Sequence, residues 1–197
     1  AAAVPAGRCR SRATTAVAAA VAVALVMLAA FGGTALDHRL TRWNHPALID
    51  TRDSPYGRVT VTSAEGQVSV FENDALAFES EGTAAEEFAH LTALQHPGPR
   101  SVLVLGGGID GLVAEALRHG PARVDYVELN KVLLEMVSPH LPGRIRGSME
   151  ETAVRVTVAD PQRFLVSAER YDLILVGMHE PSSGQTNRFY TREFFSR

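Results

Sequence analysis

The sequence has one cysteine, few aromatic residues and no strong excess of charge. The lone Cys9 excludes a disulfide framework, and no Cys/His group has zinc-ligand spacing. Aromatic residues make up 7% of the chain and the net charge is -3, which argues against general nucleic-acid binding. With 46% hydrophobic residues over 197 positions, the composition excludes disordered and fibrous classes and fits one ordinary domain.

Charge is also missing from residues 13–36, which are rich in alanine and valine. About 20 apolar residues suffice for a helix that crosses the hydrocarbon core of a membrane. We therefore predict a transmembrane helix over 13–36, after a basic tail at 1–12 and before a polar linker at 37–46. The alternative is a signal peptide, although its apolar region is usually only about 7–15 residues long.

Short alternating strands follow the linker. Residues 58–62 and 67–72 alternate between apolar and polar side chains, and turn residues follow each of them. The pattern predicts a small β-hairpin domain over 47–82. A helix is expected over 83–96, with Thr83 and Glu86 forming a capping box at its start.

From residue 100 onward, strands alternate with helices. Strands are predicted at 101–105, 123–129, 154–158 and 171–176, with helices at 112–117, 131–137 and 161–168. Continuous apolar strands joined by helices are typical of a parallel sheet covered on both faces. The fold class is therefore α/β, with a doubly wound, mostly parallel sheet. Its ligand should lie at the carboxyl ends of the strands.

A glycine turn ends the first of these strands. Gly106, Gly107, Gly108 and Gly111 stand in the run LGGGIDG, where glycine allows a ligand to approach the backbone closely. The run lacks the Lys-Ser/Thr pair of a phosphate loop, and no basic residue accompanies it to hold a pyrophosphate. This favours an S-adenosyl sulfonium ligand over a dinucleotide; a plain strand-to-helix turn is the structural alternative.

Two acidic residues stand at the ends of the next strands. Glu128 is placed to accept hydrogen bonds from the hydroxyls of a ribose, or it is a solvated acid at a strand end. Asp160 is placed to reach an adenine edge, or it caps the helix that begins at Pro161. Together with the glycine turn, the two acids describe an adenine-nucleoside site.

Five stretches resemble the spermidine/spermine synthase family, most closely its membrane-fused branch. They are DSPYGRVTV (53–61), FENDALAF (71–78), EEFAHLTALQHPGPRSVLVLGGG (86–108), VDYVELN (124–130) and YDLILVGMHEPSSGQTNRFYTREFF (171–195). The resemblance implies a small β domain, often used for oligomerisation, before a methyltransferase-like Rossmann domain over 83–197. A complete doubly wound domain would normally add further strands, and the sequence does not begin with Met, so we expect the chain to be a fragment, with the Rossmann domain truncated at its C-terminus.

The resemblance assigns roles to single residues. Gly106, Gly107, Gly108 and Gly111 match the family's cofactor turn, Glu128 matches its ribose-binding acid, and Asp160 matches its adenine-side acid.

The positions that handle the amine depart from the family. Gly57 stands where the family usually has Gln, His90 where it has Tyr, and Ile109 where it has Asp. Most importantly, Gly177 stands where family enzymes carry the aspartate that accepts the amine proton.

Three residues are candidates to replace that base: Glu180, His179 and Asp110. General-base assistance is worth roughly 10²–10⁴-fold in rate. His90 and Tyr190 are candidates for contact with the amine substrate. The structural alternatives are a loop histidine for His179, a helix residue for His90 and a core residue for Tyr190.

The resemblance implies transfer of an aminopropyl group from decarboxylated S-adenosylmethionine to a polyamine such as putrescine, with no metal. The alternatives are a degenerate sensor or partner domain, a methyltransferase that uses S-adenosylmethionine, and the soluble domain of a transporter-like membrane protein. A homo-oligomer through the β domain is expected. The arginines on either side of the apolar segment do not fix its orientation in the membrane. Availability of the co-substrate therefore favours a membrane protein whose soluble domain lies on the cytoplasmic side.

Overall fold

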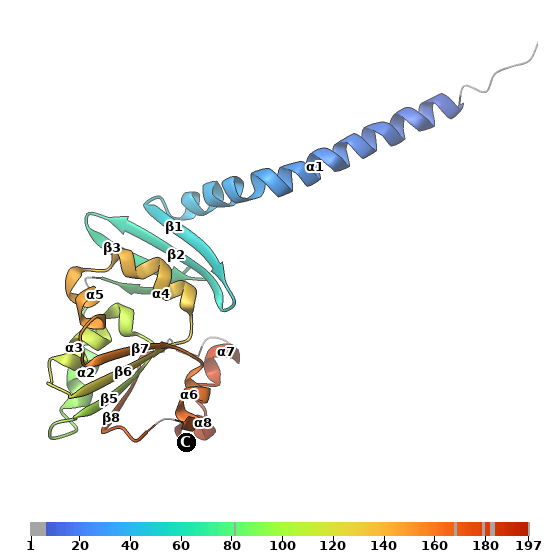
Figure 1. Cartoon of the computed structure of the whole chain (residues 1–197). Helices are drawn as coiled ribbons and strands as arrows, with labels where there is room; N and C mark the ends of the chain where they lie inside the picture. Colours follow the sequence, from blue (N-terminus) through green and yellow to red (C-terminus); the bar gives the residue numbers. More distant parts are fainter. Residues whose placement is uncertain (1–6, 81, 168, 179, 182–183, 197) are drawn as a thin grey trace, which may run out of the picture. The chain divides into compact units, whose positions relative to one another are not determined.

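The computed structural model describes residues 7–80, 82–167, 169–178, 180–181 and 184–196 (Figure 1). The chain divides into two compact units, Ala1–Pro46 and Ala47–Arg197. The first unit contains one helix, α1 (Gly7–Asn44), so most of the predicted linker is helical.

No single helix among the described residues is long and apolar enough to cross a membrane. Two parts of α1, Ala13–Leu28 and Gly32–Asn44, meet the requirements of length and composition together, but they are bent by 61° relative to each other. The structure therefore does not support the predicted transmembrane segment over 13–36 as one straight helix. The bend falls next to the Gly32-Gly33 pair, and glycine both weakens a helix and is a common site of kinks.

The second unit begins with an antiparallel sheet of four strands. They are β1 (Leu48–Ser54), β2 (Gly57–Ala64), β3 (Gln67–Glu72) and β4 (Ala75–Glu79), paired in sequence order. Val61 lies opposite Val70 in the register of β2 and β3, and both are fully buried. Alternation places the valines of these strands on one inner face, as the sequence predicts.

The second sheet is parallel throughout. It consists of β5 (Ser101–Leu105), β6 (Arg123–Glu128), β7 (Val154–Val158) and β8 (Leu173–Val176), in the order β7-β6-β5-β8. The chain starts in the middle, moves outward through β6 to β7, and then crosses back to add β8 beside β5. This reversal is a topological switch point, where ligands of open α/β sheets bind.

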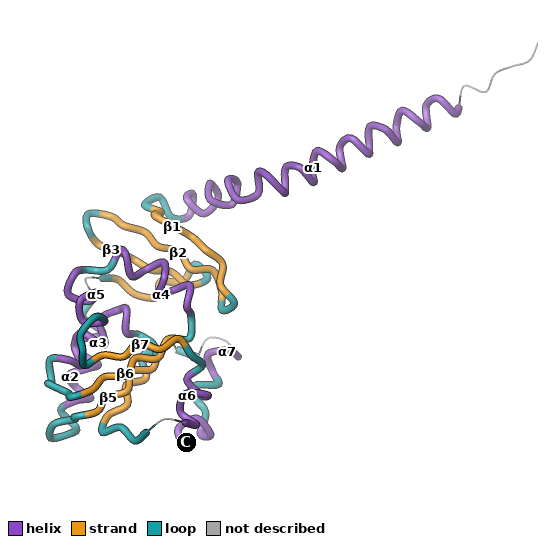
Figure 2. The backbone as a smooth tube through the Cα atoms, in the orientation of Figure 1, coloured by secondary structure: helices purple, strands orange, loops and turns teal. Residues whose placement is uncertain are grey.

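Helices cover both faces of the parallel sheet (Figure 2). They are α2 (Ala84–Ala93), α3 (Val113–Leu117), α4 (Lys131–Val137), α5 (Gly143–Met149), α6 (Pro161–Ser167), α7 (Gly184–Asn187) and α8 (Arg192–Phe195). A π-helical turn, Gly108–Leu112, precedes α3, and a 3₁₀ turn, Ser138–His140, follows α4.

Two hydrophobic clusters lie on opposite faces of this sheet. Val102 and Val104 of β5 point into a cluster shared by α2–α5 and the valines of the hairpin sheet. Leu103 and Leu105 point into a second cluster, which includes Phe189 and Phe194. The doubly wound α/β prediction is confirmed, and the antiparallel sheet is built into the same core.

The cap predicted for helix α2 is absent, and the buried side of this helix is made of small residues. Thr83 precedes the helix, but its side chain makes no capping hydrogen bond, so the capping box is not formed. The apolar side chains Leu91 and Leu94 are 64% and 76% exposed, whereas Ala89 and Ala93 are buried. Small residues form the buried side of α2, which allows close approach to the elements beneath it.

Candidate functional site

A cavity of about 480 Å³ lies between the hairpin sheet and the carboxyl ends of β5, β6 and β8. Four carboxylates line it: Glu72, Asp110, Glu128 and Glu180. Among the described residues that line the cavity there is no Lys, Arg or His. Such a cavity is electrostatically suited to a cationic ligand, since each buried carboxylate gains from a nearby positive charge.

The glycine turn forms one wall. Gly106 and Gly107 line the cavity with φ values of 69° and 70°, a conformation that residues with a Cβ rarely adopt. Gly108 lies beneath them, where a Cβ would come within 2.5 Å of the ring of Tyr126. Gly111, with a φ of 117°, lies inside the π-helical turn and does not line the cavity. The turn therefore exposes backbone to a ligand at Gly106 and Gly107.

Glu128 is held by two hydrogen bonds. The hydroxyl of Tyr126 donates to Oε2 at 2.7 Å, and the backbone N–H of Asn130 donates to Oε1 at 2.9 Å. Burial raises the pKa of Glu128 more than these two hydrogen bonds lower it. The carboxylate has a fixed orientation at the end of β6, with lone pairs left to accept from a diol.

Asn130 connects this strand end to the hairpin sheet. Its Nδ2 donates to Ser54 Oγ at 3.1 Å, and its Oδ1 accepts from the N–H of Leu133 at the start of α4. Ser54 Oγ in turn donates to Gly57 O at 2.7 Å and accepts from the N–H of Tyr56. The turn that carries Tyr56 to the cavity is thereby tied to the residue that orients Glu128.

Asp110 lies in the π-helical turn, and its carboxylate is buried and strongly perturbed. Its Oδ1 is buried and has no hydrogen-bond partner in the described part of the chain. Burial, opposed by backbone N–H groups and reinforced by the charge of Glu128, raises the pKa of Asp110 to about 7. A shift of this size marks a group that the fold holds at some cost, as functional sites often do.

The other two candidates for the base differ in position. Glu180 lines the cavity and is exposed to solvent at its edge. His179 lies outside the described residues. The structure therefore brings Glu180 and Asp110 to one cavity, together with Gly106, Gly107 and Glu128.

Asp160 lies next to the cavity, and both of its oxygens are engaged. Oδ1 accepts from the N–H of Gln162, which caps α6, and Oδ2 pairs with Arg188 Nη1 at 2.9 Å. Pro161 lines the cavity, whereas Asp160 does not. The capping role that the sequence offered for this residue is therefore present in the structure.

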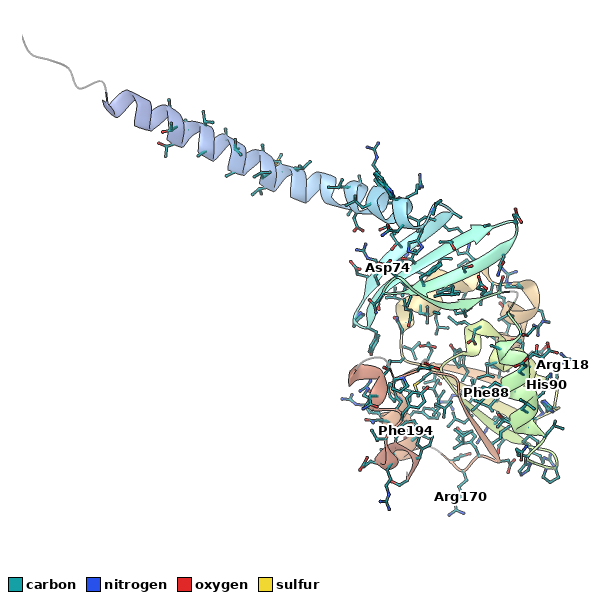
Figure 3. All side chains as sticks on the ribbon, turned by 180° about the vertical axis from the view of Figure 1, so that it is seen from behind. Asp74, Phe88, His90, Arg118, Arg170 and Phe194 are labelled. Carbon is teal, nitrogen blue, oxygen red and sulfur yellow. The ribbon has the colours of Figure 1, made fainter. Side chains whose placement is uncertain are left out.

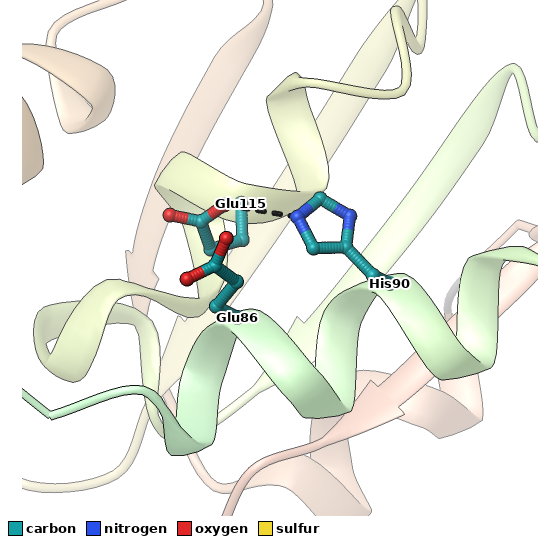
Figure 4. Close-up of side chains that lie close together, drawn as sticks. All are labelled: Glu86, His90 and Glu115. Atoms are coloured by element: carbon teal, nitrogen blue, oxygen red, sulfur yellow. Dashed lines mark ion pairs between the residues drawn. The ribbon is translucent and has the colours of Figure 1, made fainter.

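His90 lies outside the cavity, on helix α2 (Figure 3). Its Nδ1 is 2.8 Å from His119 Nε2, and its Nε2 is 3.3 Å from the carboxylate of Glu115. Figure 4 shows Glu86 and His90 pointing from α2 toward Glu115 on α3.

The group Glu86, His90 and Glu115 has donor atoms within 4.8 Å of one another, which a metal ion would require. However, Glu115 already pairs with Arg144 at 2.6 Å and with Arg118 at 3.0 Å. Two guanidinium groups neutralise the acids, so the arrangement is an ion-pair network that joins α2, α3 and α5.

Tyr190 also lies outside the cavity lining. Its hydroxyl donates to the backbone oxygen of Met178, and its ring packs on the cluster of Phe189 and Phe194. This hydrogen bond holds the loop after β8 in place, and Met178 of that loop lines the cavity, so Tyr190 acts on the cavity through Met178.

Several lining residues had no role in the sequence analysis. Glu72, at the end of β3, adds a carboxylate from the hairpin sheet, and Tyr56 and Asn130 complete the wall near Glu128. The signal that could have found Tyr56 and Glu72 was their place in two stretches of family resemblance. Asn130 had a further signal, since an Asn before a helical segment is a common N-cap.

The chain matches one protein family, and the relatives and solved structures similar to it carry related names. Residues 81–197 match the spermine/spermidine synthase domain family. A polyamine aminopropyltransferase from Korarchaeum cryptofilum is 36% identical over 112 residues, which is 56% of this chain and 35% of the relative. One from Oceanobacillus iheyensis is 32% identical over 160 residues, covering 76% of this chain and 30% of the relative.

Solved structures share the fold. A spermidine synthase in complex with the transition-state analogue AdoDATO has a TM-score of 0.69 at 21% identity, covering 76% of this chain and 52% of that one. The spermidine synthase from Thermotoga maritima has a TM-score of 0.61 at 19% identity, covering 66% of this chain and 48% of that one. The chain thus spans from about a third to about half of the length of these proteins. By the match over 81–197, it belongs to the spermine/spermidine synthase domain family.

Proposed function

We propose that this protein transfers an aminopropyl group from decarboxylated S-adenosylmethionine to an amine of a polyamine such as putrescine. The observation that carries the proposal is the cavity with four carboxylates and no basic side chain among its described lining residues. Both proposed ligands are cations, a sulfonium and an alkylammonium. Both gain from carboxylates in a partly dehydrated cavity, where charges interact more strongly than in water.

The same charge pattern supports the decarboxylated co-substrate over S-adenosylmethionine itself. The intact molecule carries a carboxylate, and that group would face Asp110, Glu128 and Glu180 without a cationic side chain from the described lining. Placing like charges together in such a cavity is unfavourable. Relatives with the name polyamine aminopropyltransferase and a spermidine synthase fold give independent support.

In the proposed complex, Glu128 accepts hydrogen bonds from the ribose, and the bare backbone of Gly106 and Gly107 lets the sulfonium chain pass close to β5. The amine gives up a proton and its lone pair attacks the CH₂ carbon next to sulfur. The C–N bond forms as the C–S bond breaks. The electron pair of the C–S bond stays on sulfur, which becomes a neutral thioether. Holding the two reactants in line supplies much of the rate in such a displacement.

Calorimetry and product analysis on the whole chain in detergent test this function. We expect decarboxylated S-adenosylmethionine to bind more tightly than S-adenosylmethionine, with binding strengthened by putrescine and lost in Glu128→Ala. Mass spectrometry should then detect spermidine. Glu151→Gln, an exposed acid outside the cavity, is the matched control. Tighter binding of S-adenosylmethionine, with no effect of polyamines, would instead indicate a methyltransferase or a sensor.

We propose in addition that residues 13–36 anchor the protein in a membrane, with the second unit on the cytoplasmic side. Support comes from the lack of charge in this segment and from side chains such as Leu25 and Leu28, which are 60% and 61% exposed. Cys9 is the only cysteine of this sequence and precedes the apolar segment, so it reports the side of the membrane from which that segment enters. An impermeant maleimide should label Cys9 from outside intact cells; extraction of the chain from membranes by alkaline carbonate would contradict the anchor.

A further inference from the structure

The position of the missing base is filled by backbone. A Cβ on Gly177 would lie 2.9 Å from the carbonyl oxygen of Gly106, 3.2 Å from Gly107 Cα and 2.7 Å from Leu112 Cδ2. Reciprocally, a Cβ on Gly107 would lie 2.8 Å from the oxygen of Gly177. The loop after β8 and the glycine turn therefore pack backbone against backbone, and no side chain at 177 fits between them without a shift.

Asp110 lies beside this contact. The point where a Cβ on Gly107 would be placed is 3.3 Å from Asp110 Oδ1 and 3.1 Å from Gly177 Cα. The carboxylate of Asp110 thus lies beside the contact between Gly107 and Gly177. In the sequence, Asp110 stands one residue after Ile109, the position at which the family has an acid. Both Asp110 and Gly177 line the cavity.

Asp110 differs from the neighbouring carboxylates in having a buried oxygen that no described residue pairs with. Its Oδ1 has no hydrogen-bond partner in the described part of the chain, although the atom is buried. Glu128 differs, because both of its oxygens accept hydrogen bonds, from Tyr126 and Asn130. Glu180 differs as well, because it is exposed at the edge of the cavity.

We infer that Asp110 is the proton acceptor for the attacking amine in this chain, in place of the acid that Gly177 does not provide. The inference rests on the proposed function and names the base for it. The ammonium group donates its proton to the carboxylate of Asp110, and the neutral amine attacks the CH₂ carbon. The C–N bond forms as the C–S bond breaks, and Asp110 releases the proton to solvent after the product leaves.

The environment of Asp110 suits this role. Burial and the charge of Glu128 raise its pKa to about 7, and a general base works best when its pKa lies near the operating pH. Arrival of a sulfonium and an ammonium favours the charged carboxylate, so the substrates themselves prepare the base.

The test compares Asp110→Asn with the wild type and with Glu151→Gln as the matched control, all as whole chains in detergent. We expect Asp110→Asn to retain binding of decarboxylated S-adenosylmethionine by calorimetry, while kcat with putrescine falls roughly 10²–10⁴-fold. In the wild type, kcat/KM, which reports the pKa of the free protein, should rise with pH through an inflection near neutrality, and the variant should lack this inflection. Glu151→Gln should behave as the wild type does.

A second variant, Gly177→Asp, restores the aspartate that family enzymes carry at this position and tests whether it can replace Asp110 as the base. Combined with Asp110→Asn, it should not restore the rate, because the backbone of Gly106 and Gly107 occupies the space. Full activity and an unchanged pH profile in Asp110→Asn, or recovery of the rate by Gly177→Asp, would overturn the inference and leave the proposed function standing. A wild type that transfers no aminopropyl group to any polyamine would overturn both.

Discussion

The hydroxyl of Tyr126 donates a 2.7 Å hydrogen bond to Glu128, two residues further along β6 on the same face. The ring of Tyr126 also lies directly beneath Gly108 and is completely buried. One side chain therefore supports the glycine turn and orients the carboxylate that we assign to the ribose. The two halves of the proposed nucleoside site are thus linked through a single ring.

Removing this hydroxyl should weaken both stability and binding. In Tyr126→Phe, Glu128 Oε2 loses its donor inside the protein, and an unsatisfied buried group costs about 1–3 kcal/mol. Urea unfolding should show this loss, and calorimetry should show weaker binding of decarboxylated S-adenosylmethionine. Tyr171→Phe is the control, because its hydroxyl donates at 2.8 Å to Asp125, and neither residue lines the cavity. Equal losses of binding in both variants would refute the specific link.

A methyl group under the glycine turn should be poorly tolerated. In Gly108→Ala the new Cβ would lie 2.5–2.6 Å from three ring atoms of the buried Tyr126, so the ring and the turn must move apart. Overpacking of this kind costs about 1–3 kcal/mol. Gly147→Ala, in helix α5 with open space around it, should instead stabilise by up to about 1 kcal/mol. Thermal or urea unfolding of the pair checks both signs.

Asp110 should make the protein less stable as the pH rises. Its pKa is about 7 in the folded protein against an ordinary 3.8, so folding favours the protonated form. The contribution of Asp110 to stability is therefore fully present below 3.8 and is lost as the pH rises toward about 7, by up to roughly 4 kcal/mol. Asp110→Asn removes this titration, so it should be more stable than the wild type at a pH of about 8. A constant difference across the pH range would argue against the burial of the charge.

The ion-pair network at Glu115 should contribute measurably to stability. Burial raises the pKa of Glu115, but hydrogen bonds from Arg144 and Arg118 outweigh it, and the pKa is lowered. The stabilisation is thus present above the ordinary value of 4.5 and is lost as the pH falls through the lowered pKa. Glu115→Gln should cost about 1–3 kcal/mol in neutral solution. Glu86→Gln, with one exposed contact of 3.6 Å, should stay within about 0.5 kcal/mol.

Much of the fold was predictable because each element of the core carries its own pattern. Strand β5 was predicted with its observed bounds, since a continuous apolar run between Pro99 and Gly106 leaves few alternatives. Helix α5 (Gly143–Met149) was not predicted, because two glycines and two arginines in seven residues give no apolar periodicity. The buried side of α2 was also not evident, because Ala89 and Ala93 are less apolar than the exposed Leu91 and Leu94.

The site was predictable where it follows from strand ends and less so where it depends on loop packing. The ends of β5 and β6 bring Gly106, Gly107 and Glu128 to one cavity, as the parallel topology requires. The sequence placed His90 and Tyr190 among substrate contacts, but neither lines the cavity: His90 contacts His119, and the hydroxyl of Tyr190 donates to Met178 of the loop after β8. Such partners arise from long-range contacts that spacing along the chain does not encode.

The order of the strands has a consequence for how the protein folds. Each hairpin strand pairs with its neighbour in sequence, as Ser54 does with Gly57, whereas β5 pairs with β8 across about 70 residues. Local pairings form faster than distant ones, because a long loop must be closed before a distant contact gains anything. The hairpin sheet should therefore be protected early in pulsed hydrogen exchange, and the amides of β8 late. During synthesis, the hairpin sheet, which forms one wall of the cavity, could therefore fold before the parallel sheet that completes the cavity has been made.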